Sequence, residues 1–423
     1  MSPGRLFGRL IPNKGLSLGA EGADEGDSLN IPVGDPGRRW LAVGSSSATD
    51  GTTAADELCE RALTGPDPRL LTVFASDKCD LETLMKRLRQ HVGSTPVIGC
   101  STAGEIVPGG PRDASVVAIA LGGDGFSVAT AVGRDASTRL RAAGADAAAA
   151  LRDTAVRARP HQVLLLLSDG LGGDQQEVVR GAYGVAGAGV PLVGGCAGDD
   201  LKMLRTFQMF GDEVLSDAVV GAAIGSDAPF GIGVRHGWRR VGEPMLITKS
   251  VGNRVLAIDD QPALDAYLAR LEAPEEAGAD AAAFTRFALT HPLGLVRRGR
   301  EEVRFIAEAD VSDRSIGCIA SVPQGALAWL MEGDVASVLA ATDGACRDAL
   351  ADLDGHPPLG IIAFDCIARR GVLGDQGISL EVDHIESQTG AVPLAGFYTY
   401  GEIARTNGTG GFHNQTLVVL AVA

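Results

Sequence analysis

Apolar and polar positions along the chain follow two alternating patterns, one typical of amphipathic helices and one typical of buried strands. The helical pattern, with apolar residues at i, i+3, i+4 and i+7, occurs at Leu81, Leu84, Met85 and Leu88. A second helix is predicted from Val335 onward, with Asp334 as its N-cap. Val163 to Leu167 is a continuous apolar run, which predicts a strand covered on both faces. The chain is also apolar from Leu417 to its last residue, so we expect an interior strand there.

One order of parts occurs three times along the chain, which indicates an internal repeat. Each copy begins with an apolar strand that ends near an Asp: LLTVFASD (70–77), VLLLLSD (163–169) and IIAFD (361–365). A helix-compatible stretch and a Pro-apolar-apolar-Gly segment follow, the latter at 96–99, 191–194 and 393–396. A returning apolar strand closes each copy, at 115–121, 218–224 and 415–422. The Pro suits a strand entry, and the Gly lets the backbone approach a neighbour or a ligand closely.

The repeat predicts both the fold class and the division of the chain. Each unit reads as strand, helix, strand, turn and strand, which predicts an α/β (α+β) protein with mixed β-sheets layered with helices. We expect two such domains, at 37–235 and 236–423, because the pattern between 229 and 260 changes to successive strands with Gly turns. Residues 1–36 are rich in Gly, Asp, Ser and Pro without periodicity, and are predicted to be a flexible N-terminal tail.

Charge and cysteine content exclude several classes of protein. The 423 residues carry a formal net charge of −16, which argues against nucleic acid or an anionic membrane as the main partner. The seven Cys are odd in number and form no C-x-x-C, so neither a disulfide framework nor a zinc finger is expected. The sequence has no signal-peptide pattern and no apolar run of about 18 residues. A cytoplasmic location fits these features best.

Three signatures resemble the FIST family of signal-input proteins. TPVIGCSTAGE (95–105) is similar to the hallmark of the FIST N-terminal domain, and VPLVGGCAGDD (190–200) resembles that domain's second signature. PLAGFYTYGEI (393–403), with FHNQT (412–416), resembles the end of the FIST C-terminal domain. The resemblance extends over 37–423, so the two predicted domains correspond to a FIST N-terminal-like and a FIST C-terminal-like domain.

The resemblance implies a sensory function in bacterial-type signalling. FIST modules are proposed to bind small ligands, with amino acids as one suggestion, and to feed histidine kinases, chemotaxis receptors or cyclic-dinucleotide enzymes. Some stand-alone members bind haem and sense nitric oxide. The chain carries no kinase or cyclase segment of its own, so we expect its output to pass through a separate partner. The resemblance implies no catalytic residue, and we expect a binding protein rather than an enzyme.

Polar residues in and beside these signatures are expected to line one ligand pocket. They are Ser101, Thr102, Glu105, Asp200, Asp365, Tyr398, Tyr400, Glu402 and His413. Glu105 and Glu402 occupy equivalent repeat positions, and converging carboxylates could bind the ammonium group of an amino acid. The two Tyr and His413 cluster in a chain with only 4% aromatic residues, and ligand pockets pair apolar walls with a few oriented polar groups. This interpretation requires the three Pro-x-x-Gly segments to fold back so that their polar ends meet around a shared cavity.

Other interpretations of the same residues stay open. The hydroxyls between Gly99 and Gly104 could satisfy themselves in a tight turn, and an acidic residue after Gly is often a turn or cap residue. The same segment is similar to a nucleophile elbow, although its second Gly comes one residue late for G-x-S-x-G. An enzyme with a Cys or Ser nucleophile is therefore an alternative, and its candidate nucleophiles are Cys100, Ser101, Cys196 and Cys366.

The sequence motifs limit which cofactors the chain is expected to bind. Noncovalent haem is an alternative, since His236 and His291 have apolar or Gly neighbours, but the sequence does not identify an axial ligand. No His and Asp/Glu spacing typical of metal ligands occurs, so no metal is expected. The sequence has no Walker A and no G-x-G-x-x-G, so ATP and dinucleotides would lack their usual phosphate cradle.

Overall fold

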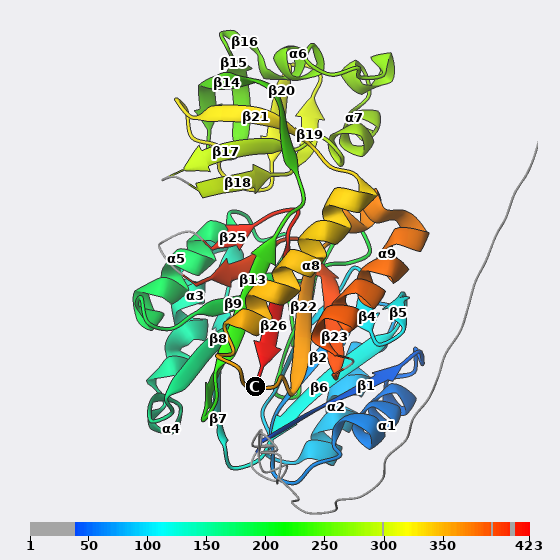
Figure 1. Cartoon of the computed structure of the whole chain (residues 1–423), viewed down its shortest axis with the longest axis vertical. Helices are drawn as coiled ribbons and strands as arrows, with labels where there is room; N and C mark the ends of the chain where they lie inside the picture. Colours follow the sequence, from blue (N-terminus) through cyan, green and yellow to red (C-terminus); the bar gives the residue numbers. More distant parts are fainter. Residues whose placement is uncertain (1–38, 298–299, 391, 407–410) are drawn as a thin grey trace, which may run out of the picture. The chain divides into compact units, whose positions relative to one another are not determined.

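Helices and mixed sheets alternate along the chain, which confirms the predicted α/β class (Figure 1). The computed structural model describes residues 39–297, 300–390, 392–406 and 411–423, so the predicted tail at 1–36 lies outside the described residues. The two predicted helices are present, and the Asp334 carboxylate accepts a hydrogen bond from the Ser337 N–H at 2.7 Å as the predicted N-cap.

Three copies of one unit account for most of the described chain. The first copy comprises β1 (Trp40–Ser46), α1 (Gly51–Ala62), β2 (Pro68–Ala75), α2 (Leu81–Val92), β3 (Val97–Ser101), β4 (Glu105–Val107), β5 (Gly110–Arg112) and β6 (Val116–Gly122). The second comprises β7 (Phe126–Arg134), α3 (Ala136–Ala147), η1 (Ala148–Arg152), α4 (Thr154–Arg157), β8 (His161–Ser168), α5 (Gln175–Ala186), β9 (Leu192–Cys196), β10 (Gln208–Phe210), β11 (Glu213–Leu215) and β12 (Ala218–Ser226).

The third copy is interrupted after its first strand. It comprises β13 (Phe230–Arg235), α8 (Val335–Ala351), β22 (Gly360–Cys366), α9 (Ile367–Thr389), β23 (Leu394–Thr399), β24 (Glu402–Arg405), β25 (Phe412–His413) and β26 (Leu417–Val422). The insert between β13 and α8 contains β14 (Arg239–Val251), β15 (Arg254–Ile258), β16 (Gln261–Pro262), α6 (Ala263–Leu268), η2 (Glu275–Gly278), α7 (Ala281–Ala288), β17 (Leu293–Arg297), β18 (Arg300–Arg304), β19 (Ile306–Asp310), β20 (Ser315–Cys318) and β21 (Leu327–Glu332). The insert forms its own sheet and its own apolar core.

Each copy contributes the same four strands to a sheet, in the orders β1-β6-β2-β3, β7-β12-β8-β9 and β13-β26-β22-β23. In each sheet the third strand is parallel to the fourth and antiparallel to the second. The predicted order of strand, helix, strand, turn and strand is therefore present three times. Every copy also begins with a strand and a helix that were not part of the repeat predicted from the sequence.

The Gly of each Pro-x-x-Gly segment is required by close packing of two strands. A Cβ on Gly99, Gly194 or Gly396 would lie 2.3, 1.9 or 2.0 Å from a carbonyl oxygen of the parallel neighbour strand. No side chain larger than hydrogen fits at such a distance, so the shared motif is explained by backbone approach.

The turn that follows the fourth strand is a β-hairpin, and each copy donates its hairpin to the sheet of another copy. The hairpin β4–β5 of the first copy pairs with β23 of the third, β24–β25 of the third pairs with β9 of the second, and β10–β11 of the second pairs with β3 of the first. Each copy thus gives one hairpin and receives one, which closes a ring. The ring ties the chain on both sides of the predicted boundary at 235 into shared sheets.

The apolar core lies between the inner faces of the sheets, and helices cover the outer faces. Phe74, Phe364 and Phe397 meet there, with ring centroids of Phe74 and Phe397 4.6 Å apart. Figure 1 shows α8 and α9 over the near face of the sheet that contains β22 and β23. The sheets therefore pack as one body, with the loops after β3, β9 and β23 near their shared centre.

Candidate functional site

The three Pro-x-x-Gly segments meet through their own backbones. Three equivalent hydrogen bonds close a ring at the ends of β3, β9 and β23, from Ala103 N–H to Tyr398 O at 3.0 Å, from Gly198 N–H to Ser101 O at 3.0 Å and from Tyr400 N–H to Cys196 O at 3.2 Å. In each copy this ring lies between the fourth strand and the hairpin that pairs with another sheet. The predicted convergence of the segments is therefore present in the structure.

The centre of this junction is closed to solvent rather than open as a shared cavity. Ser101, Thr102 and Tyr398 are fully buried, and a Cβ on Gly198 would lie 2.9 Å from Ala103 N. A depression of about 430 Å³ lies elsewhere, beside α4 and the end of α5, and none of the predicted site residues lines it. The shared cavity predicted at this centre stays a prediction, and the part of the junction that solvent reaches is its edge.

Glu105 and Glu402 use their carboxylates within the fold. Glu105 accepts hydrogen bonds from the hydroxyls of Thr102 and Ser115 and from the Ser115 N–H, so both of its oxygens are engaged. Glu402 has equivalent bonds from Thr399 and Thr416. Burial raises the pKa of each carboxyl to about 7, although the same hydrogen bonds oppose the shift.

The second copy carries an amide at the equivalent position. Gln208 Oε1 accepts from the Ala218 N–H at 3.2 Å, and its Nε2 donates to the Thr206 hydroxyl at 3.3 Å. An acid or an amide at this position thus ties the start of each hairpin to the returning strand. These contacts account for the repeated Gly-Glu-Ile without a ligand.

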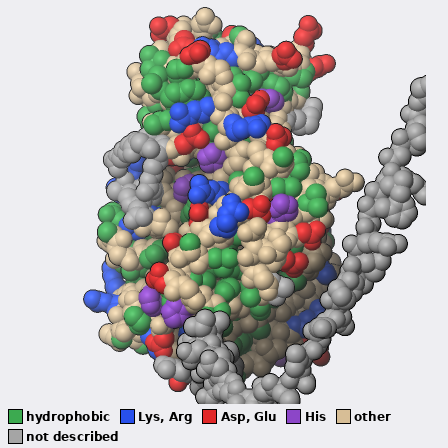
Figure 2. All heavy atoms as spheres, viewed as in Figure 1, with side chains coloured by type: hydrophobic (Ala, Val, Ile, Leu, Met, Phe, Trp, Pro, Cys, Tyr) green, Lys and Arg blue, Asp and Glu red, His purple; other side chains and the backbone are tan. Residues whose placement is uncertain are grey.

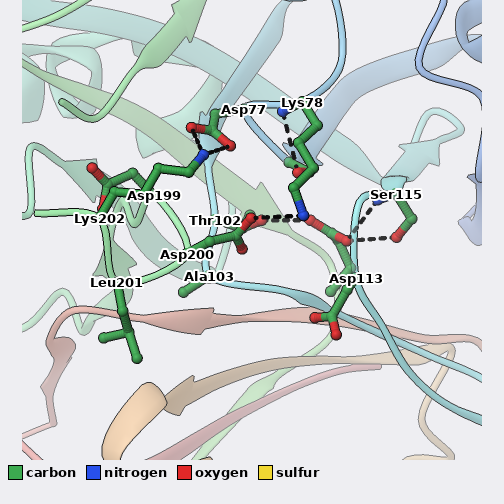
Figure 3. A network of polar contacts seen from close by, with 12 residues as sticks. Asp77, Lys78, Thr102, Ala103, Asp113, Ser115, Asp199, Asp200, Leu201 and Lys202 are labelled. Carbon is green, nitrogen blue, oxygen red and sulfur yellow. Dashed lines mark hydrogen bonds and ion pairs between the residues drawn. The ribbon is translucent and has the colours of Figure 1, made fainter. Parts of the chain in front are cut away.

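Charged groups from three copies gather at the edge of the junction, and we call Lys78, Asp113, Asp200 and Arg370 the rim cluster. Lys78 Nζ lies 3.5 Å from Asp200 Oδ2. Arg370 donates to both carboxylate oxygens of Asp113, at 2.7 and 2.8 Å. Figure 3 shows Lys78, Asp113 and Asp200 around Thr102 and Ala103. Figure 2 shows basic and acidic side chains interspersed on one face of the molecule.

The rim cluster differs in exposure from the closed centre. The side chains of Lys78 and Asp113 are 52% and 56% exposed, whereas those of Asp200 and Arg370 are 20% and 21% exposed. Hydrogen bonds from Arg370 hold the pKa of Asp113 below its usual value. The Arg370 guanidinium also lies over the Tyr398 ring, 5.0 Å from its centroid, which links the rim to the buried phenol.

Asp200 belongs to a loop, residues 199–206, whose backbone is unusual. Asp200, Leu201 and Met203 have positive φ values of 55°, 61° and 53°, a region that costs non-glycine residues free energy. The Asp199 carboxylate stabilises the loop by accepting from three of its N–H groups and from the Tyr400 hydroxyl. Burial would raise the pKa of Asp199, but these hydrogen bonds together hold it below its usual value.

Two other predicted site residues have partners away from the rim cluster. Asp365 is fully buried at the end of β22 and pairs with Arg369 at 2.7 Å. His413 lies on β25, with Nε2 2.9 Å from the Ala404 carbonyl oxygen. Sequence reasoning missed Lys78, Asp113 and Arg370 as site residues. Lys78 follows β2, whose C-terminal end adjoins that of β3, and this shared edge is the signal that could have found it.

The candidate nucleophiles are either hydrogen-bonded within the fold or held as protonated thiols. The Ser101 hydroxyl donates to the Gly198 carbonyl at 2.8 Å and accepts from the Phe207 N–H at 2.9 Å. Cys100, Cys196 and Cys366 are buried free thiols, and burial raises the pKa of each well above its usual value. A reactive thiolate needs the opposite environment, so these side chains do not fit a nucleophile.

His236 and His291, the two histidines named for the haem alternative, have partners within the fold. His236 Nδ1 accepts from the Trp238 N–H at 3.0 Å, and its Nε2 lies 3.5 Å from Glu301. The His291 ring stacks on Phe287 with centroids 4.4 Å apart, and its Nδ1 lies 2.9 Å from the Phe287 carbonyl oxygen. Neither histidine lines the depression beside α4 and α5. In the described part of the chain, no group of three or more His, Cys, Asp and Glu is arranged to hold a metal ion.

Hydropathy gives one further constraint. Among the helices that the structure describes, none combines the length and the apolar character needed to cross a membrane.

Comparison with known proteins identifies the family. The FIST N domain matches residues 69–261 and the FIST C domain matches residues 263–405. The two matches span more than half of the chain, which therefore belongs to the FIST family, a family of sensory domains in signal transduction. The two matches meet inside the insert, whereas the predicted boundary lies at the end of β13 and stays a prediction.

Individual relatives are more distant and only partly covered. The uncharacterised protein Rv0628c of Mycobacterium tuberculosis is 27% identical over 237 residues, 54% of this chain and 60% of that protein. The uncharacterised protein MJ1623 of Methanocaldococcus jannaschii is 27% identical over 154 residues, 34% of this chain and 30% of that protein. The chain thus matches less than two thirds of the length of either relative.

Proposed function

We propose that this chain is a sensory input protein that binds a small zwitterionic ligand, with a free amino acid as the leading candidate, at the rim cluster. The observation that carries the proposal is the gathering of two basic and two acidic side chains from three different repeats at one edge. Membership in a sensory family supports the same role.

The charges of the rim cluster match those of an amino acid. A ligand carboxylate would pair with Lys78 and Arg370, and a ligand ammonium group would pair with Asp200 and Asp113. The present pair between Lys78 and Asp200 is 3.5 Å long and half exposed on the lysine side. An exposed pair of this kind contributes only about 0–1 kcal/mol, so a ligand can replace the pair between Lys78 and Asp200 at little cost.

We propose that ligand binding changes the arrangement of the loop at 199–206 and that this change is read by a partner. Asp200 is the first of its left-handed residues, and Leu201, Met203 and Leu204 expose apolar side chains to 58%, 49% and 80%. A ligand that binds one arrangement of this loop more tightly shifts the population toward it. We propose that a separate signalling protein, such as a histidine kinase, a chemotaxis receptor or a cyclic-dinucleotide enzyme, reads that arrangement.

The first test is direct detection of a ligand. Native mass spectrometry and an absorbance spectrum of the freshly purified chain would report a co-purified metabolite or haem. A thermal-shift screen with the common free amino acids then follows. We expect at least one amino acid to raise the unfolding midpoint, because a ligand that binds only the folded state stabilises it. A Soret band, or no shift with any amino acid, would contradict the proposal.

A further inference from the structure

A buried ion cluster lies between β22, α8 and α9, apart from the rim cluster. Arg369 is fully buried and pairs with two carboxylates, Asp365 at 2.7 Å and Glu381 at 2.5 Å. The Glu381 Oε1 atom that pairs with Arg369 also lies 2.7 Å from the Thr342 hydroxyl of α8. Arg369 Nη1 donates to the His236 carbonyl at 3.0 Å, just before β14 and the insert begin.

The charges of this cluster do not balance. One guanidinium faces two carboxyl groups, so the site would carry a net negative charge if both were ionised. Asp365 Oδ2 and Glu381 Oε2 are buried and accept no hydrogen bond from any described residue. The Tyr398 hydroxyl is likewise buried without a partner among the described residues. Burying an uncompensated charge is costly, so a positive charge must enter the site.

Neighbouring groups do not supply that charge. From the β13–β14 connection, the His236 ring is held neutral, since burial lowers its pKa to about 4. From β23 and β24, Tyr398 and Glu402 are neutral or acidic, and α8 contributes the hydroxyl of Thr342. Arg370 on α9 is already paired with Asp113 at the rim. Only a proton or a small cation could therefore complete the cluster.

We infer that Asp365 and Glu381 share one proton, taken from solvent, and that this proton completes a net-neutral site with Arg369. Arg369 pairs with Asp365 Oδ1 and Glu381 Oε1, so the proton would be carried by the other oxygens, Asp365 Oδ2 and Glu381 Oε2, which are buried without a partner among the described residues. Burial raises the pKa of Asp365 well above its usual value, in agreement with a retained proton. The site would thus bind a proton at pH values where the unfolded chain has released it.

The proton would couple two parts of the fold. Asp365 ends β22, Glu381 lies in α9, and Arg369 holds the carbonyl of His236 at the entry to the insert. Losing the proton at alkaline pH would leave a negative charge in a site closed to solvent. We therefore expect stability to fall as pH rises toward the raised pKa of Asp365, because over that range the folded state binds more protons than the unfolded state.

Infrared spectroscopy tests the inference. At about pH 9 Glu105 and Glu402, the buried glutamates whose pKa values are raised to about 7, are ionised. We expect a protonated-carboxyl C=O band that shifts in D₂O in the unmodified chain. The band should be absent in Asp365→Asn and in Glu381→Gln, because the remaining carboxylate then pairs with Arg369 alone. A Glu105→Gln control should retain it.

The contrary outcomes are equally specific. No band in the unmodified chain at about pH 9, or a band that survives either substitution, would overturn the inference. A missing band together with an unfolding midpoint that depends on K⁺ or Na⁺ concentration would assign a cation instead. If the Asp365 and Glu381 variants do not fold, the Glu105→Gln/Glu402→Gln chain serves, since a proton on the pair requires its band to persist.

Discussion

Glu105 and Glu402 lie almost 300 positions apart in sequence and have the same hydrogen-bond partners, a threonine three residues earlier and a hydroxyl residue that precedes the returning strand. The equivalence extends to their pairing, since each begins a hairpin that joins the sheet of another repeat. The carboxylate therefore joins a donated hairpin to the repeat from which it comes. Substituting one such carboxylate therefore tests how much this connection contributes to the stability of the fold.

Removing this carboxylate should destabilise the fold. Glu402→Ala leaves the Thr416 N–H and two hydroxyls without their acceptor in a buried site, and each lost partner costs about 1–3 kcal/mol. We expect a loss of at least about 3 kcal/mol in the free energy of unfolding, measured by urea denaturation. Glu402→Gln is the matched control, because Gln208 serves at the equivalent position. Equal losses for both variants would contradict the assigned role.

The pH dependence of stability should carry the signature of the same two acids. Their folded pKa values of about 7 lie above the ordinary glutamate value of 4.5. The folded state therefore holds more protons than the unfolded state between these values, and this contribution to stability is lost as pH rises from about 4.5 to about 7. Urea titrations at several pH values should show a smaller decline for Glu105→Gln. An unchanged decline would count against the shifted pKa.

The close strand contact at each Pro-x-x-Gly segment predicts a large cost for a single methyl group. A Cβ in Gly396→Ala would lie 2.0 Å from the Ala363 carbonyl oxygen, so the strands must separate. We expect a loss of more than about 3 kcal/mol in the free energy of unfolding. Gly184→Ala in α5 is the control, where a Cβ meets nothing within 4 Å, and it should be neutral or slightly stabilising. Similar results for both would refute the packing argument.

The loop at 199–206 should lose order when Tyr400 loses its hydroxyl. That oxygen accepts from the Asp199 and Leu201 N–H groups and donates to the Asp199 carboxylate. In Tyr400→Phe, hydrogen exchange of the 201–206 amides should be faster, whereas the β22 amides serve as an internal reference and should be unchanged. Unaltered protection in the loop would show that Tyr400 does not hold it.

Local features of the fold could be predicted from sequence because they depend on neighbouring residues. Apolar spacing identified α2, and the apolar run at 163–167 identified β8. The Gly of each repeated segment follows from close backbone approach, and the structure gives the distances. These signals are confined to short windows of chain.

The hairpin exchange and the rim cluster could not be predicted in the same way. Pairing of β4 with β23 joins segments almost 300 positions apart, and no local pattern records it. The same exchange brings Arg370 of α9 to Asp113 of the first repeat. Comparing the repeats within the sequence instead led to Glu105 and Glu402 as candidate pocket residues. The structure explains their equivalence by a shared structural role inside each repeat.

Isothermal titration calorimetry tests the central claim, that a zwitterionic ligand binds at the rim cluster. The probe is whichever free amino acid gives the largest thermal shift, titrated into the unmodified chain, Asp200→Asn, Arg370→Gln and the control Arg134→Gln, which breaks an exposed pair with Glu213. We predict a loss of affinity of about tenfold or more, or at least about 1.4 kcal/mol, for the two rim variants and none for the control. Equal affinity in all four chains would contradict the account.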